Sequence, residues 1–152
     1  MTHMSKLAHI DPRTARVVAF FEHLSPSSLK QELTQIYAEQ ARFKDPFNEV
    51  QGQAAIARVF EHMFATTQAP RFEVLSAMTE GQQAWLSWEF LIDRPSGDTW
   101  HIRGATHLHY AEDGRIARHR DYWDPAEELY ARLPVLGPLV RWLTRRLSTP
   151  PH

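Results

Sequence analysis

The sequence predicts an α+β fold in which helices pack on one face of a curved, mostly antiparallel sheet. Three observations lead to this prediction. Helical patterns come first, with one short strand candidate among them; strands in two hairpins follow; and a further helical segment ends the chain. Helices segregated from a run of antiparallel strands are typical of domains whose helices cover one side of the sheet.

Two helices near the N-terminus are marked by their start signals. Asp11 and Ser25 are each followed by a proline, which combines a capping side chain with a residue suited to the first helical turn. Apolar residues recur at helical spacing after each signal, so we expect an antiparallel or sharply bent helix pair. A third helix is expected over residues 53–66, because its wide apolar face is typical of a helix packed across a sheet.

The strands are predicted where the spacing of apolar residues changes from helical to alternating. Residues 41–45 form a short strand candidate that ends at Pro46, and residues 47–52 are expected to be a loop. Later in the chain apolar residues alternate, which predicts four strands, over 71–78, 83–93, 99–110 and 115–124. The side chains expected to face inward from the two middle strands are Leu86, Trp88, Phe90, Ile92, Trp100, Ile102, Gly104, Thr106, Leu108 and Tyr110.

The C-terminal part contains two helical segments. Asp124 followed by Pro125 is a helix start, and we expect that helix to stop at Pro134. Residues 135–147 carry an apolar stripe with arginines mostly elsewhere. This segment is expected to fold over a cavity mouth or onto a second subunit, and a membrane-surface helix is the alternative. The chain thus divides into a flexible N-terminus (1–10), one domain (11–130) and an amphipathic helical tail (131–152).

The composition restricts the classes of function. The chain has 152 residues, of which 43% are hydrophobic and 23% charged, as expected for one globular domain. A formal net charge of -1 gives no bulk attraction to nucleic acid, and the lack of cysteine excludes disulfides and thiolate chemistry. No apolar run is long enough for a membrane span and no signal peptide is recognisable, so we expect a cytoplasmic protein.

The last predicted strand carries residues that indicate a site. Along RIARHRDYWD, His119, Asp121 and Trp123 face one side, and the intervening residues, which include two arginines, face the other. The arginines indicate the solvent side. A buried acid beside an imidazole needs compensating contacts, so we expect the opposite face to line a pocket.

The expected strand pairing adds detail to this pocket. If Tyr110 pairs with Arg115, Thr106 lies opposite His119 and Gly104 lies opposite Asp121. The glycine would then leave space beside the acid for a ligand or water. Residues two apart on a strand are roughly 7 Å apart, so His119 and Asp121 would need a bridging molecule.

Two segments resemble one superfamily. YAEQARFKDPF, residues 37–47, is similar to the segment in which ketosteroid isomerases place a general-base Asp before a proline, and Asp45 matches that position. DGRIARHRDYWD, residues 113–124, resembles the closing strand of SnoaL-like cyclases and limonene-epoxide hydrolases, and Asp121 matches their activating acid. Residues 13–128 thus resemble the nuclear transport factor 2-like superfamily, in its branch of SnoaL-like polyketide cyclases and ketosteroid isomerases. The resemblance implies a cone-shaped barrel in which the sheet wraps around three N-terminal helices.

The chain departs from both enzyme patterns. Phe21 and Thr106 occupy the positions of the oxyanion-donating Tyr and acid of ketosteroid isomerases, so steroid isomerisation is not predicted. The Arg-x-Asp triplet of the epoxide hydrolases has no counterpart in residues 85–93. The resemblance instead implies a small hydrophobic ligand in a cone-shaped pocket. It is either processed by cofactor-independent acid–base chemistry of isomerase, cyclase or hydrolase type, or bound without catalysis.

The candidate catalytic residues are Asp121, Asp45 and His119, with a carboxylate as general base and the imidazole as its partner. Each has a structural alternative: a helix-end cap or arginine pair for Asp121, a loop cap for Asp45, and a hydrogen-bonded core role for His119. The candidate ligand contacts are Tyr37, Phe21, Phe60, Trp88, Phe90, Trp100, Thr106, Leu108 and Trp123. No cofactor is expected, since proton abstraction next to a carbonyl needs none.

A row of histidines, His101, His107 and His109, lies on the opposite face of its strand. Two histidines at i and i+2 can hold a metal, but this face is expected to be external, and no metal site is predicted. We expect a second copy of the chain to cover part of it in a homodimer. A dimeric interaction domain whose cavity is filled by side chains is the remaining alternative.

Overall fold

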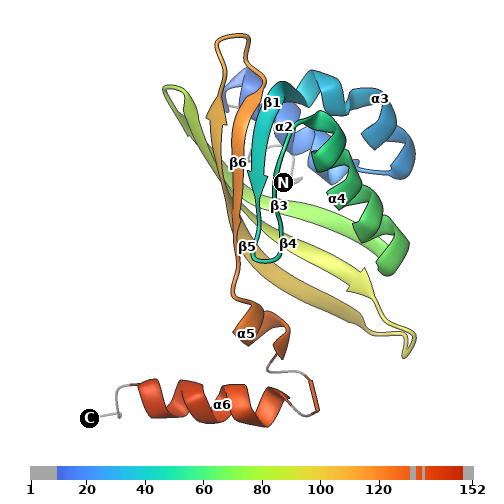
Figure 1. Cartoon of the computed structure of the whole chain (residues 1–152), viewed down its shortest axis with the longest axis vertical. Helices are drawn as coiled ribbons and strands as arrows, with labels where there is room; N and C mark the ends of the chain where they lie inside the picture. The colour runs from blue at the N-terminus through green and yellow to red at the C-terminus, as the bar shows by residue number, and fades with distance from the viewer. Residues whose placement is uncertain (1–9, 131–132, 135, 149–152) are drawn as a thin grey trace, which may run out of the picture.

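The computed structural model describes residues 10–130, 133–134 and 136–148. A curved, unclosed sheet of six strands carries helices on one face (Figure 1). Its strand order is β2-β1-β6-β5-β4-β3, and every neighbouring pair is antiparallel except β1 and β6, which are parallel. The predicted α+β class is therefore confirmed. The expected flexible N-terminus lies outside the described residues, apart from Ile10.

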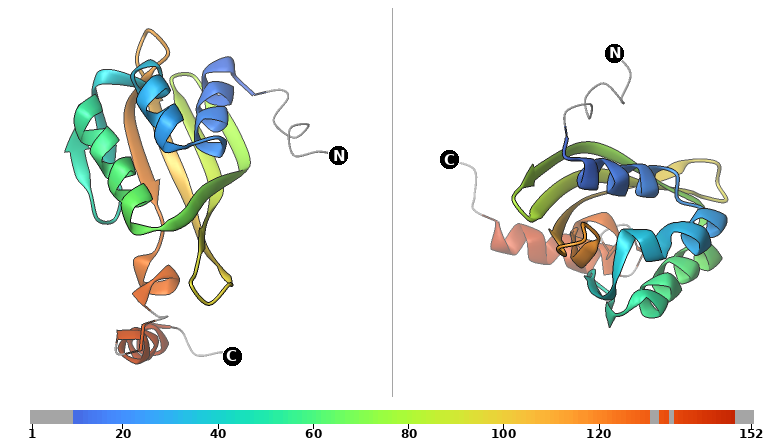
Figure 2. Two further views of the ribbon diagram at one scale, coloured as in Figure 1. Left: turned by 90° about the vertical axis from the view of Figure 1, so that its right-hand side faces the viewer. Right: turned by 90° about the horizontal axis from the view of Figure 1, so that it is seen from above.

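Three helices, α2 (Pro12–Glu22), α3 (Pro26–Ile36) and α4 (Gln53–Thr66), lie on one side of the sheet (Figure 2). The two predicted start signals act as caps. The Asp11 carboxylate accepts a hydrogen bond from the Arg13 backbone N–H, and Ser25 forms a reciprocal capping box with Ser28. The buried Thr14 hydroxyl contacts Tyr110 Oη at 2.7 Å, which fixes α2 to the sheet.

The strands are β1 (Tyr37–Lys44), β2 (Glu49–Gln51), β3 (Gln68–Glu80), β4 (Gln83–Asp93), β5 (Thr99–Tyr110) and β6 (Ile116–Tyr122). The prediction placed the first strand four residues too late, because α3 already ends at Ile36 and Tyr37 has extended backbone angles. The expected loop over residues 47–52 contains β2, which pairs with β1. The inward-facing sets predicted for β4 and β5 are buried or half-buried as expected.

The register of the last hairpin differs from the prediction. Tyr110 pairs with Ile116 rather than Arg115, and an irregularity follows in which Ala117 is the extra residue. Such a bulge places two residues of one strand against one of its partner. As a result Thr106, not Gly104, lies opposite Asp121. Turn spacing alone carries no signal for this bulge.

The core lies between the sheet and the three helices. Its fully buried members include Tyr37 of β1, Ile56 of α4, Leu108 of β5 and Ile116 of β6, so all these elements contribute to one cluster. Aromatic rings are concentrated near its centre, where Phe21, Phe43 and Phe60 are each less than one tenth exposed. The parallel pairing of β1 with β6 brings a segment from the first third of the chain against its last strand.

Two short helices follow the sheet. α5 (Pro125–Glu128) begins where predicted, with Asp124 accepting hydrogen bonds from the backbone N–H groups of Ala126 and Glu127, but it ends at Glu128 rather than Pro134. α6 (Leu136–Leu147) lies beyond the end of the sheet, away from α2–α4 (Figure 1). Within the described ranges, no helix combines the length and apolar character that crossing a membrane requires.

Candidate functional site

A buried polar network runs through the core between β1 and β6. His119 is 2% exposed, and both of its ring nitrogens have partners. Nδ1 lies 2.8 Å from the hydroxyl of Tyr37, and Nε2 lies 2.6 Å from Oδ1 of Asp121. The direct contact corrects the expectation that a bridging molecule separates His119 from Asp121. The side chains of His119 and Asp121, two positions apart on β6, bend toward each other, so the imidazole reaches the carboxylate.

The burial of Tyr37 assigns the protons of this network. Burial, and then the negative charge of Asp121, raise the pKa of the Tyr37 hydroxyl well above its usual value of 10.0, so it stays protonated. His119 Nδ1 is the hydrogen-bond partner of this fully buried hydroxyl among the described residues. Because an unpaired buried O–H is costly, the hydroxyl donates to Nδ1. His119 Nε2–H then donates to Asp121.

The network continues from Asp121 on β6 to the neighbouring strands β5 and β4. Asp121 Oδ1 also accepts a hydrogen bond from the Thr106 hydroxyl at 2.6 Å, and Thr106 accepts one from the indole N–H of Trp88 at 2.7 Å. One carboxylate oxygen thus holds two donors. The other, Oδ2, has no hydrogen-bond partner within the described residues, and the side chain is 17% exposed. Asp121 is therefore fixed through one oxygen and open at the other.

Gly104 has a different role from the one expected. It lies opposite Trp88 on the neighbouring strand, and a Cβ added there would come within 2.4 Å of the indole ring. Contacts that short do not occur between real atoms, so the residue must be glycine for the indole to lie flat against the strand. The space at Gly104 is filled by Trp88, and this positions the indole N–H toward Thr106.

Three hollows border Asp121, and two of them share aromatic walls. The inner one has a volume of about 20 Å³ and is walled by Phe21, Phe60, Phe72, Val74, Leu86, Trp88, Thr106, His119 and Asp121. The outer one measures about 420 Å³ and shares Asp121, Phe60, Phe72 and Trp88 with it. A space of about 20 Å³ holds one water molecule, whereas several hundred Å³ suit a small organic ligand. The carboxylate thus stands between a water-sized space and a ligand-sized one.

The predicted ligand contacts divide between these cavities. Phe21 and Thr106 line the inner cavity, and Phe90, Trp100 and Trp123 line the outer one. Phe60 and Trp88 line both. Tyr37 and Leu108 line neither: both are completely buried, and Tyr37 contributes through His119 instead.

Asp45 lies in the wall of the outer cavity but acts as a loop cap. Its Oδ1 accepts hydrogen bonds from the backbone N–H groups of Phe47 and Asn48, and both carboxylate oxygens are close to Asn48 Nδ2. These donors fix the turn after Pro46. The structural alternative raised for Asp45 is what the geometry shows, although the side chain remains at the cavity edge.

Several lining residues were not among the predicted contacts. Phe72 lies at the junction of both cavities, stacked on Phe90 at 4.6 Å between ring centres. His62 of α4 and Leu129, just after α5, complete the outer wall. Alternation along β3 carried a usable signal for Phe72. His62 lies at an exposed helical position, so apolar periodicity gave no signal for it.

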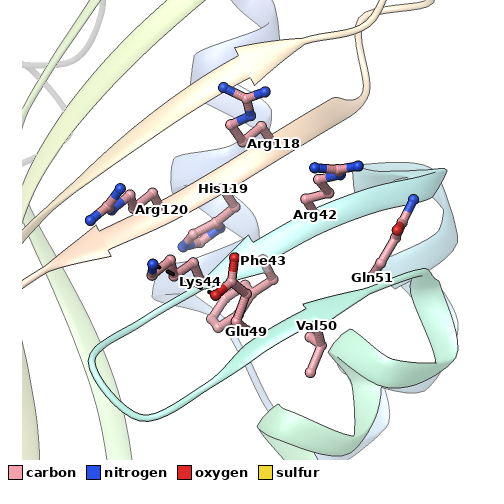
Figure 3. Close-up of a pocket in the computed structure, with 9 residues that line it drawn as sticks. All are labelled: Arg42, Phe43, Lys44, Glu49, Val50, Gln51, Arg118, His119 and Arg120. Atoms are coloured by element: carbon pink, nitrogen blue, oxygen red, sulfur yellow. Dashed lines mark ion pairs between the residues drawn. The ribbon is translucent and has the colours of Figure 1, made fainter.

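A basic hollow of about 490 Å³ opens on the outer face of the sheet between β1 and β6, and Phe43 and His119, which also line the cavities described above, border it. Figure 3 shows Arg42 and Lys44 on β1 beside Arg118 and Arg120 on β6. The pairs Arg42–Arg118 and Lys44–Arg120 are directly opposed in the parallel register. The histidine row lies on the same outer face, where His107 stacks on Trp85. The pKa of His107 is lowered, first by burial and second by the neighbouring His109.

Comparison with known proteins identifies the fold. Similar solved structures include a proposed isomerase of the SnoaL-like family from Agrobacterium tumefaciens (21% identity, TM-score 0.63, 80% of this chain and 98% of that one). A proposed SnoaL-like polyketide cyclase from Shewanella putrefaciens is 16% identical (TM-score 0.65, 83% and 90%). AclR from Streptomyces galilaeus, a proposed hydroxylase, is 17% identical (TM-score 0.63, 96% and 93%).

At these identities the solved structures establish the fold and not the activity. No curated protein sequence matches the chain. The model of the SnoaL-like domain family matches residues 17–119, which is more than half of the sequence and includes His119. The chain therefore belongs to the SnoaL-like family, and its cone has the nuclear transport factor 2-like fold.

Proposed function

We propose that the outer cavity binds a small, mostly apolar carbonyl compound and that Asp121 acts on it as a general base. The observation that carries this proposal is the asymmetry of the Asp121 carboxylate. One oxygen is held by His119 and Thr106, the other has no hydrogen-bond partner among the described residues, and Asp121 lines both cavities. A general base needs this combination of fixed orientation and a free lone pair.

The proposed reaction is a proton transfer. Asp121 Oδ2 removes a proton from the carbon next to the ligand carbonyl, and the C–H electron pair moves to form an enolate. The proton then returns to the same or another carbon, which gives exchange or isomerisation without a cofactor. His119 touches Asp121 and not the ligand, because both of its nitrogens are already engaged. It is therefore a positioning residue in this proposal.

The inner cavity supports a second reaction type at the same carboxylate. A water molecule in this space would lie beside Asp121, whose Oδ2 has no partner among the described residues, and beside the Thr106 hydroxyl oxygen, which can accept a second hydrogen bond. Asp121 could then remove a proton from that water for attack on a ligand in the outer cavity. Isotope labelling separates the reactions: proton abstraction incorporates deuterium from D₂O at carbon, and water attack incorporates ¹⁸O.

The variant Asp121→Asn tests catalysis with little disturbance of the network. The amide oxygen can still accept from Thr106 and His119, whereas the group at the Oδ2 position becomes a donor that cannot act as a base. Asp113→Asn is the matched control, since Asp113 is paired with Arg115 in the turn after β5, outside both cavities. A panel of apolar carbonyl compounds is screened for binding by thermal shift and for isotope incorporation by mass spectrometry.

Loss of turnover in Asp121→Asn, with binding retained and Asp113→Asn fully active, supports the proposal. Equal turnover in Asp121→Asn and the parent chain refutes it. A ligand that binds both proteins equally, without any isotope incorporation, favours the alternative of a binding module. In that case the aromatic wall matters, and Trp100→Ala should weaken binding while Asp121→Asn does not.

We also propose that two copies of the chain associate through the outer sheet face. Support comes from large apolar side chains exposed there, namely Met78, Trp85 and Tyr122, each more than 40% exposed. The basic hollow lies at the β1–β6 end, so the charges of two copies would repel if these ends met. Light scattering should show a dimer for the parent chain and a monomer for Trp85→Glu. A monomeric parent chain would refute this arrangement.

A further inference from the structure

The helix α6 presents an apolar face to solvent. Leu139, Trp142 and Leu143 are 52%, 49% and 43% exposed, and Leu147 is 84% exposed. The leucines of the helix recur at positions 136, 139, 143 and 147, which places them along one side. Within the described residues, α6 lines neither cavity. The described arrangement therefore does not make it a lid.

An apolar helix of this length needs a surface to lie on. α6 has 12 residues, and isolated helices shorter than about 12–15 residues are marginal in water, because nucleation is unfavourable. Pro138 in its first turn helps the start, but propensity alone does not stabilise a helix of this size. Its stability must come mainly from contacts made by the leucine side.

The charge of the tail indicates which surface this is. Four of the 17 basic residues of the chain, and none of its 18 acidic ones, follow Tyr130. Three of these, Arg141, Arg145 and Arg146, are on α6. The guanidinium of Arg146 lies over the Trp142 ring at 5.4 Å, so a cation and an indole flank the leucine stripe together. Leucine and tryptophan beside arginine, without acids, are typical of helices that lie in the headgroup region of a membrane.

We propose that α6 binds an anionic lipid bilayer, with its axis parallel to the membrane plane and its leucines in the acyl boundary. The length excludes a span, because 12 residues cover about 18 Å of helix against a hydrocarbon core of about 30 Å. The proposal does not depend on the function proposed for the cone. A cytoplasmic protein, which the sequence predicts, would meet an anionic leaflet, which attracts basic segments.

Sedimentation of the full chain with lipid vesicles tests this binding. One vesicle preparation is phosphatidylcholine alone, and the other is an equimolar mixture with phosphatidylglycerol. The parent chain should sediment with the mixed vesicles and be released by salt. Replacing Arg141, Arg145 and Arg146 by Gln should weaken binding on the order of 100-fold, since each basic residue near the surface contributes about one kcal/mol. Leu139→Glu with Leu143→Glu should abolish binding.

The basic hollow on the sheet provides a matched control. Replacing Arg42, Arg118 and Arg120 by Gln removes the same number of charges from another exposed surface, and vesicle binding should remain within a few-fold of the parent chain. Brominated acyl chains should quench the fluorescence of the parent chain more than that of Trp142→Phe. The proposal is overturned if the parent chain fails to bind the mixed vesicles, or if the sheet variant loses as much affinity as the tail variant. It is also overturned if the double leucine variant still binds the mixed vesicles. The same holds if the parent chain does not bind lipid and the double leucine variant only changes a dimer into a monomer.

Discussion

The hydrogen bond between Tyr37 and His119 gives a sharp prediction, because both groups are almost completely buried. Tyr37→Phe removes one oxygen atom and leaves the ring in place, so the change in packing is small. What remains is an imidazole nitrogen without a partner in the core. An orphaned buried polar group costs about 1–3 kcal/mol, and this is the expected loss in the free energy of unfolding. For a chain of this size the midpoint of thermal unfolding should fall by about 3–10 °C.

Urea titration followed by circular dichroism measures this loss, with Tyr122→Phe as the control. Tyr122 is 43% exposed, and the same chemical change there should alter stability by less than about 0.5 kcal/mol. Nitrogen NMR of His119 in the parent chain should show the hydrogen on Nε2. Equal stability of Tyr37→Phe and Tyr122→Phe, or a hydrogen on Nδ1, would refute the proton assignment of the network.

Three further predictions follow from other contacts. Burial raises the pKa of the Tyr37 hydroxyl above 10.0, so on raising the pH the unfolded chain loses this proton before the folded chain does. The free energy of unfolding should therefore fall as the pH rises above 10.0, and it should fall less steeply in Tyr37→Phe. Urea midpoints at several pH values measure both slopes. Gly104→Ala should lower the free energy of unfolding by about 1–3 kcal/mol, because the added methyl group displaces the Trp88 ring. A changed tryptophan emission spectrum would report the displacement, whereas unchanged stability would contradict the contact. Ser25→Ala removes the cap of α3 and should cost about 1 kcal/mol in thermal unfolding, while Ser27→Ala, in the same turn, should be nearly neutral; equal losses would argue against the cap.

Much of the fold could be predicted because local patterns encode it. The start signals at Asp11 and Ser25 identify two helices, and alternation along β4 and β5 identifies which side chains face inward. The pairing of residues across neighbouring strands could not be predicted as well from these local patterns. The bulge at Ala117 shifts the register of the last hairpin, and alternation along a strand does not locate such an extra residue.

The candidate site was predicted in part for the same reason. Alternation placed His119 and Asp121 on the inner face, which the structure confirms. It could not show that Tyr37 begins a strand and reaches His119, because this contact joins residues 82 positions apart. Nor could it show that Asp45 caps a loop while Asp121 joins a buried network, since the two acids differ by the donors around them and not by their sequence pattern.

The place of β6 between β1 and β5 has a consequence for how the chain folds during synthesis. Until residues 116–122 have emerged, the sheet consists of two separate pieces, β2-β1 and β5-β4-β3, each with an open edge facing the gap. Open strand edges are sites of aggregation, so a nascent chain that stalls before Ile116 would be vulnerable to it. Tyr37 is synthesised 82 residues before His119, and its hydroxyl has no partner among the described residues until β6 is complete. The buried network therefore forms among the last native contacts of the domain during synthesis.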